Sequence, residues 1–114
     1  MFEDFKLKVF KAVASCHSFT LASRELNISQ SAVSQNIADI ERMAGVSLFL
    51  RNRGEVVLTD AGKVFEMLAD RILKDYEDLN SVFQDFSSFE SIVRQVQTLK
   101  EDPRFEAIKE LYLK

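Results

Sequence analysis

The chain has 114 residues, 46% of them apolar and 29% charged, which suffices for one compact domain with an appendage. One proline and three glycines favour a mainly α fold over a many-stranded sheet. No apolar run approaches the ~20 residues that span a bilayer, and the charged N-terminus does not resemble a signal peptide. We therefore expect no membrane contact and a cytoplasmic location.

The first predicted element is a helix over residues 2–17. Its apolar side chains recur at intervals of three and four, with Leu7 and Phe10 widening the face. The positions predicted to be buried are Phe2, Phe5, Val9, Ala12, Val13 and Cys16. Cys16 is the single cysteine, so we expect a buried, reduced thiol.

Two shorter helices are predicted next. Thr20 is expected to cap the first of them, which ends at Leu26. Ser29 is expected to cap the second, whose apolar positions include Val33, Ile37 and Ile40. Gly45 is expected to end it, because glycine tolerates a positive φ.

Two short β-prone runs follow, residues 46–50 and 55–58, joined by residues 51–54 with Asn52 and Gly54 available for the turn. Helix, helix-turn-helix and hairpin is the element order of a winged helix. Thr59 is predicted to cap the next helix, and Gly62 in its first turn would permit close packing.

The most regular pattern lies between residues 63 and 86, where apolar positions alternate in steps of four and three. Such a seam is typical of a coiled coil. About 27 helical residues reach ~40 Å, beyond a domain this small, so the pattern favours pairing of two copies over packing on the chain's own domain. The predicted dimerisation residues are Phe65, Ala69, Ile72, Tyr76, Leu79, Phe83 and Phe86.

Several segments closely resemble the helix-turn-helix of LysR-type transcriptional regulators, namely residues 18–22, 26–34, Ile37 and Ile40-Glu41. Residues 45–49, Arg51 and residues 58–62 resemble that family's wing and the start of its linker helix. The resemblance implies a mainly α architecture with a small β-hairpin wing, made of a winged helix-turn-helix DNA-binding domain (1–62) and a linker and dimerisation helix (63–86). The apolar pattern of residues 87–114 instead predicts a C-terminal extension of short helices.

In such a motif the helix that starts near Gln30 enters the major groove. Gln30 suits adenine because its carboxamide donates and accepts in one plane. Arg51 and Arg53 are placed to touch the DNA backbone or enter the minor groove, although Arg51 has the alternative of pairing with Glu55. The candidate DNA-binding residues are Ser18, Thr20, Ser29, Gln30, Ser31, Ser34, Gln35, Arg51 and Arg53.

The sequence departs from the family at three positions that bear on DNA affinity. Many members have Pro where Ser31 stands, Arg where Gln35 stands and a second Arg where Gly54 stands. The net charge of −3 is also low for a DNA binder, although residues 1–63 hold eight basic and seven acidic residues. Fewer cations weaken the phosphate interaction, so we expect low or strongly salt-sensitive affinity.

The expected partners are double-stranded DNA and a second copy of the chain, in a homodimer or a higher homo-oligomer. Family members continue into an α/β effector-binding domain, whereas residues 87–114 have helical patterns, so we expect no small-molecule effector domain. The sequence shows no glycine-rich phosphate loop, nucleophile set or metal-ligand spacing, and His17 is its only histidine. We therefore expect neither an enzyme nor a cofactor. The alternative is a winged-helix protein-interaction module that pairs with another regulator.

Overall fold

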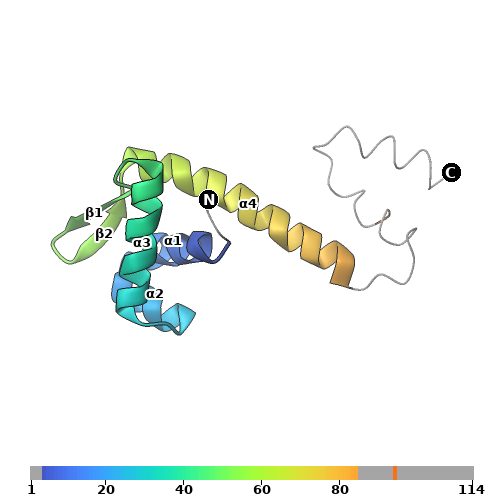
Figure 1. Ribbon diagram of the computed structural model, residues 1–114, viewed down its shortest axis with the longest axis horizontal. Coiled ribbons are helices and arrows are strands. Elements are labelled where there is room, and N and C mark those ends of the chain that lie inside the picture. Colours follow the sequence, from blue (N-terminus) through green and yellow to red (C-terminus); the bar gives the residue numbers. More distant parts are fainter. Residues whose placement is uncertain (1–3, 85–93, 95–114) are drawn as a thin grey trace. The chain divides into compact units, whose positions relative to one another are not determined.

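The computed structural model describes residues 4–84 and residue 94 (Figure 1). The chain divides into two compact units, Met1–Lys74 and Asp75–Lys114. Phe2, Phe86 and nearly all of the predicted helical extension over residues 87–114 lie outside the described residues. None of the helices in the described part is long and apolar enough to cross a membrane.

The first unit is a winged helix-turn-helix, as the element order predicted. Its two strands form an antiparallel hairpin with Phe49 opposite Leu58 and Asn52 opposite Glu55. In Figure 1 the tip of this hairpin lies away from the helices. The elements in chain order are α1 (Asp4–Cys16), α2 (Phe19–Leu26), α3 (Gln30–Ala44), β1 (Phe49–Asn52), β2 (Glu55–Leu58) and α4 (Asp60–Gln84), which continues into the second unit.

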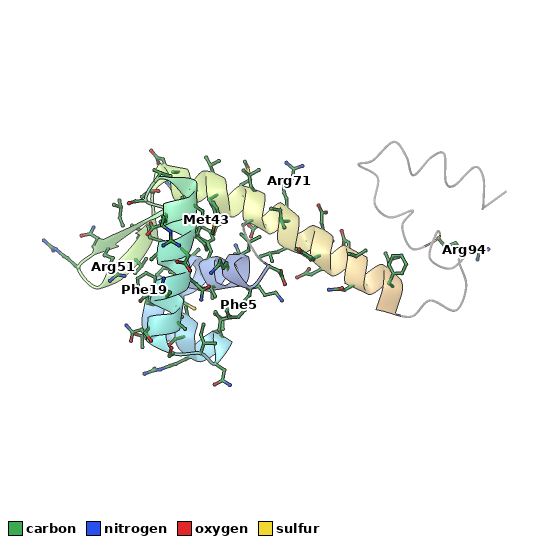
Figure 2. The ribbon with its side chains drawn as sticks, in the orientation of Figure 1. Phe5, Phe19, Met43, Arg51, Arg71 and Arg94 are labelled. Atoms are coloured by element: carbon green, nitrogen blue, oxygen red, sulfur yellow. The ribbon has the colours of Figure 1, made fainter. Side chains whose placement is uncertain are left out.

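The core of this unit lies where α1, α2, α3 and the hairpin meet. Its fully buried side chains include Val9, Phe10 and Val13 of α1, which centre the buried face of that helix. Phe5 was predicted to be buried but is 46% exposed (Figure 2), and Cys16 is half-buried. Both residues lie at the ends of α1, Phe5 in its first turn and Cys16 as its last residue, whereas the buried residues lie between them.

The start of α2 differs from the prediction. Ser18, not Thr20, is the N-cap, and its Oγ accepts a hydrogen bond from the Leu21 backbone N–H at 3.1 Å. His17 has a positive φ of 54° and ends α1, so the extended residue that follows it takes the capping position. Thr20 therefore lies within the first turn of α2, where it is exposed.

The ends of α3 are those predicted. Ser29 caps the helix by accepting from the Ala32 N–H at 3.0 Å, and Gly45 ends it with a φ of +74°. The strand after it starts later than predicted, at Phe49. Residues 46–48 instead lead from α3 to the hairpin, held there because Glu41 Oε2 accepts from the Leu48 N–H at 2.6 Å.

The wing turns through Arg53 and Gly54, both with positive φ, as in the two-residue turns that match the twist of a hairpin. Asn52, predicted to be available for the turn, is the last residue of β1. An arginine with a φ of +52° is uncommon, because its Cβ crowds the backbone there. The turn therefore places Arg53 at the tip of the hairpin.

The first turn of α4 is fixed to the segment before the wing. Thr59 caps it as predicted, accepting from the Gly62 N–H at 2.9 Å and donating to the Ser47 carbonyl at 2.8 Å. A Cβ added at Gly62 would overlap the Leu48 carbonyl oxygen. The predicted close packing at Gly62 is thus confirmed, and it brings the helix backbone against this loop.

Candidate nucleic-acid interface

Helix α3 has an apolar face in the core and a polar face opposite. Val33, Ile37 and Ile40 are buried. At about 100° per residue, the opposite side carries a row of exposed residues, termed here the outer row. The outer row consists of Ser31, Gln35, Ala38 and Arg42.

The N-terminal end of α3 carries the other predicted contacts. Gln30, the first residue of the helix, is exposed, whereas Ser34 is half-buried at the side of the outer row. Ser29 Oγ lies 3.2 Å from Ser31 Oγ in addition to capping the helix. Backbone N–H groups at a helix N-terminus favour anions, so this end is suited to a phosphate as well as to a base edge.

A polar network joins the outer row to α1. Asp39 Oδ1 accepts from Gln35 Nε2 at 3.0 Å and from Arg42 Nη2 at 2.8 Å, while Asp39 Oδ2 accepts from Lys6 Nζ at 3.1 Å. Lys6 Nζ also donates to Asn36 Oδ1 at 3.1 Å. The hydrogen bonds from Lys6, Arg42 and Gln35 lower the pKa of the Asp39 carboxyl from its ordinary value.

Of this network, Gln35 was predicted as a site residue, whereas Lys6, Asn36, Asp39 and Arg42 were not. The predicted contacts on α3 all lie in its first two turns. The spacing in the sequence could have predicted Arg42, which lies seven residues after Gln35 and therefore on the same side of the helix. Asp39 carries no comparable signal, because its role depends on Lys6, 33 residues earlier in the chain.

The predicted contacts outside α3 lie on α2 and the wing. The Arg51 guanidinium lies over the ring of Phe19, with its Cζ 4.3 Å from the ring centroid (Figure 2). Val56, not Glu55, is its partner across the hairpin, and no ion pair joins Arg51 to Glu55 within the described residues. This stacking holds Arg51 against the start of α2, where Ser18 is half-buried and Thr20 is exposed.

The predicted dimerisation seam divides into an inward and an exposed part. Phe65 packs against Phe10 with ring centroids 4.6 Å apart, and Ala69 is only 2% exposed. Lys11 of α1 adds ion pairs to Glu66 at 3.4 Å and to Asp70 at 3.1 Å. Burial by itself would lower the pKa of Lys11, but these two carboxylates outweigh it and raise that pKa.

A set of exposed apolar residues on α4, spaced by three or four positions, forms what is termed here the exposed face. Val64 and Leu68 were not predicted to belong to it, but they lie beside Ile72 and are exposed. Within the second unit, Tyr76, Leu79 and Phe83 are exposed and Val82 is buried. The exposed face comprises Val64, Leu68 and Ile72 in the first unit and Tyr76, Leu79 and Phe83 in the second, at intervals of three or four residues along the sequence.

Other chemistry is sparse in the described part of the chain. No group of His, Cys, Asp and Glu side chains there is arranged to hold a metal ion. The Cys16 thiol donates to Glu25 Oε2 at 3.2 Å, and this hydrogen bond, with burial, raises the pKa of the thiol. His17 Nδ1 lies 3.1 Å from the Val56 carbonyl oxygen, which ties the end of α1 to the wing.

These features define a winged helix-turn-helix domain of the DNA-binding class. Helices α1, α2 and α3 pack together with the hairpin wing, and α3 is capped and exposes its polar face. The family described as bacterial regulatory helix-turn-helix protein, lysR family, matches residues 5–63. The chain belongs to this family and carries its DNA-binding domain, as the sequence motifs indicated.

Relatives of the chain are described as transcriptional regulators. It is 42% identical over 80 residues to the HTH-type transcriptional regulator YfeR of Shigella flexneri, covering 70% of this chain and 25% of that protein. It is 48% identical over 58 residues to the RuBisCO operon transcriptional regulator of Allochromatium vinosum, covering 51% of this chain and 19% of that protein. The matched segment thus spans a quarter or less of these relatives.

Solved structures of similar chains are also DNA-binding domains. The CbnR DNA-binding domain in complex with DNA is similar with a TM-score of 0.66 and 32% identity, over 69% of this chain and 91% of that one. The BenM DNA-binding domain in complex with benA site 1 DNA is similar with a TM-score of 0.68 and 30% identity, over 72% and 92%. Both similar chains are DNA-binding domains with DNA bound.

Proposed function

We propose that this protein is a sequence-specific, DNA-binding transcriptional regulator that binds an inverted-repeat site as a homodimer. The observation that carries the proposal is the exposed N-terminal half of α3. Gln30 is exposed at the capped N-terminus of α3, and Ser31 and Gln35 are exposed on the side opposite the buried residues. Those buried residues are Val33, Ile37 and Ile40, which anchor the helix. A rigid helix with short polar side chains on one side fits the major groove, where base edges carry a distinct donor and acceptor pattern.

The wing supplies the second set of contacts. Arg53 is exposed at the hairpin tip, and Arg51 is held over Phe19 near the start of α2. A guanidinium stacked on an aromatic ring retains its charge and most of its donors for a phosphate. In the proposed complex these arginines bind the backbone beside the major groove, and Ser18 and Thr20 lie near the same strand.

The dimer follows from the exposed face of α4. Ile72, Tyr76, Leu79 and Phe83 are each 44–55% exposed, so a monomer leaves four large apolar side chains in contact with water. Pairing with the same face of a second copy removes those side chains from water and creates two-fold symmetry. A two-fold dimer presents two copies of α3 to two half-sites of opposite orientation, which is an inverted repeat.

The test is selection from a random-sequence duplex pool at two salt concentrations, followed by sequencing of the retained DNA. We expect an inverted repeat whose half-site centres lie one helical turn, about 10 base pairs, or a multiple of it apart. A Gln30→Ala/Gln35→Ala variant is the matched control, since both side chains are exposed and neither packs in the core. Retention of no DNA at low salt would contradict the proposal, and retention without sequence enrichment would contradict its specificity.

A further inference from the structure

We propose that Asp39 is a positioning residue that orients the side-chain amide of Gln35 for base recognition. With its Nε2 held by Asp39, Gln35 presents its Oε1 acceptor outward and selects a base that carries an exocyclic amino group, adenine or cytosine. The inference rests on the proposed function and assigns a specificity to one position of the outer row.

The orientation of the amide follows from hydrogen-bond chemistry. Gln35 Nε2 lies 3.0 Å from Asp39 Oδ1, one helical turn further along α3. An ionised carboxylate only accepts hydrogen bonds, so the amide must turn its NH₂ group toward Asp39. The flipped arrangement would place Oε1 against a carboxylate oxygen. Oε1 therefore points away from Asp39.

Asp39 is itself held from two other directions. Lys6 Nζ donates to Oδ2 at 3.1 Å and Arg42 Nη2 donates to Oδ1 at 2.8 Å, and the Asp39 side chain is 18% exposed. Lys6 is held in turn by Asn36, whose Nδ2 donates to the Ala32 carbonyl at 2.8 Å. Because its partners lie on both α1 and α3, the carboxylate keeps its position when Gln35 meets a base.

The network also explains how a recognition helix tolerates a carboxylate near its outer row. A bare carboxylate there would repel DNA phosphates. Lys6 and Arg42 offset its charge, and the same hydrogen bonds keep the group ionised, as its lowered pKa indicates. The position thus retains a strong acceptor for Gln35 without adding net negative charge to the surface.

The base preference follows from the outward oxygen. In the major groove, adenine presents its N6 amino group and cytosine its N4 amino group as donors, whereas guanine O6 and thymine O4 are acceptors. An outward Oε1 pairs with a donor and repels an acceptor. The second proton on Nε2 remains available, so adenine, which also offers N7, satisfies both amide atoms.

The experiment compares duplex-pool selections by the wild type, Asp39→Ala, Gln35→Ala and the double variant, with Lys6→Met as control. Gln35→Ala locates the base position that Gln35 contacts. At that position we expect Asp39→Ala to lower the ratio of adenine or cytosine to guanine or thymine by about tenfold, typical of one specific base contact. The double variant should match Gln35→Ala alone. Lys6→Met removes the tie to α1 but leaves Asp39 with its hydrogen bonds to Gln35 and Arg42, so it should lower the melting temperature and weaken the preference less than Asp39→Ala does.

The possible failures are distinct. If the wild type enriches no sequence, the proposed function fails and the inference with it. If it enriches an inverted repeat but Asp39→Ala keeps the same profile, only the inference fails. An equal loss at every base position, shared by Lys6→Met, would assign Asp39 a merely structural role and would also overturn it.

The hydrogen bond can be tested on the wild-type protein alone. The side-chain NH₂ resonances of Gln35, identified by their loss in Gln35→Ala, should shift when acid protonates Asp39. Lys6 and Arg42, which also face Asp39, stay charged throughout that titration. Resonances that do not move as Asp39 titrates would overturn the proposal.

Discussion

The ring of Phe65 on α4 packs against the ring of Phe10 on α1, with centroids 4.6 Å apart. Phe10 is fully buried and also packs against Phe49 of the wing, 5.0 Å between centroids. One side chain therefore joins the first helix, the hairpin and the start of the long helix. Helix α1 covers Phe65 but not Val64 or Leu68, which are exposed, so the exposed face of α4 begins beside this contact.

Replacement of Gly62 by alanine should destabilise the winged helix. The new Cβ would overlap the Leu48 carbonyl oxygen, which already accepts from the Thr59 N–H at 3.0 Å and is not free to move. We expect a loss of ~1–3 kcal/mol, as for overpacking elsewhere, despite the better helix propensity of alanine. Thermal unfolding measures it, with the exposed Lys63→Ala as control. An equal or higher melting temperature for Gly62→Ala would show that α4 does not approach the loop this closely.

Charges introduced on the exposed face of α4 should produce monomers. In an Ile72→Asp/Leu79→Asp variant, two carboxylates would be buried against the partner, which is costly without counter-charges. Sedimentation equilibrium and DNA titration should show a monomer that binds the operator poorly. A Lys63→Gln/Ser81→Asp variant shifts the net charge by the same amount at two exposed positions that are not among the exposed face and should remain dimeric. A dimer of normal affinity in the first variant would rule out pairing through this face.

The two kinds of proposed DNA contact should respond differently to mutation. Gln30→Ala should relax preference at one base position by ~1–3 kcal/mol, because it removes a base contact. Arg53→Ala should instead weaken binding to all sequences alike and reduce the salt slope by about one, because it removes a phosphate contact. Titrations of operator and scrambled duplexes at several salt concentrations distinguish the two. A base-specific effect of Arg53→Ala would mean that the wing reads sequence.

Cys16 should react slowly with alkylating agents. Its thiol donates to Glu25, and this hydrogen bond and burial raise its pKa, so less of the nucleophilic thiolate is present at neutral pH. The rate of alkylation against pH should have a midpoint above that of a free cysteine. Glu25→Gln should lower the midpoint, whereas Glu55→Gln on the wing should leave it unchanged. Because the chain has one cysteine, the measured rate belongs to Cys16 alone.

The Asp39 network should stabilise the fold only while Asp39 is ionised. Its pKa is lowered in the folded protein by hydrogen bonds from Lys6, Arg42 and Gln35. The stabilisation is therefore fully present above the unfolded pKa of about 3.9 and is lost as pH falls through the lower folded value. The difference in melting temperature between wild type and Asp39→Asn should be constant from about pH 6 to 8 and shrink in acid. A difference that grows in acid would mean that the carboxylate is not held by cations.

Local patterns predicted much of the fold. Ser29, Gly45 and Thr59 were identified as the ends of helices because capping depends on residues within one turn. The same reasoning failed at Thr20, where the left-handed conformation of His17 moved the cap to Ser18. Strand β1 starts three residues later than predicted because of a contact outside its own residues. Glu41 accepts a hydrogen bond from the Leu48 N–H, seven residues further along, and holds the preceding loop out of the strand.

The sequence by itself determined the class of domain, the helix-turn-helix and the apolar periodicity of α4, because each depends on residues that lie only a few positions apart. The tertiary structure decided which apolar residues of α4 face the core, since Phe65 and Val64 are adjacent in sequence and differ only in what α1 covers. It also decided the orientation of Gln35. That orientation depends on Asp39 and on Lys6, 33 residues from Asp39, and only folding brings such distant charges within hydrogen-bond distance.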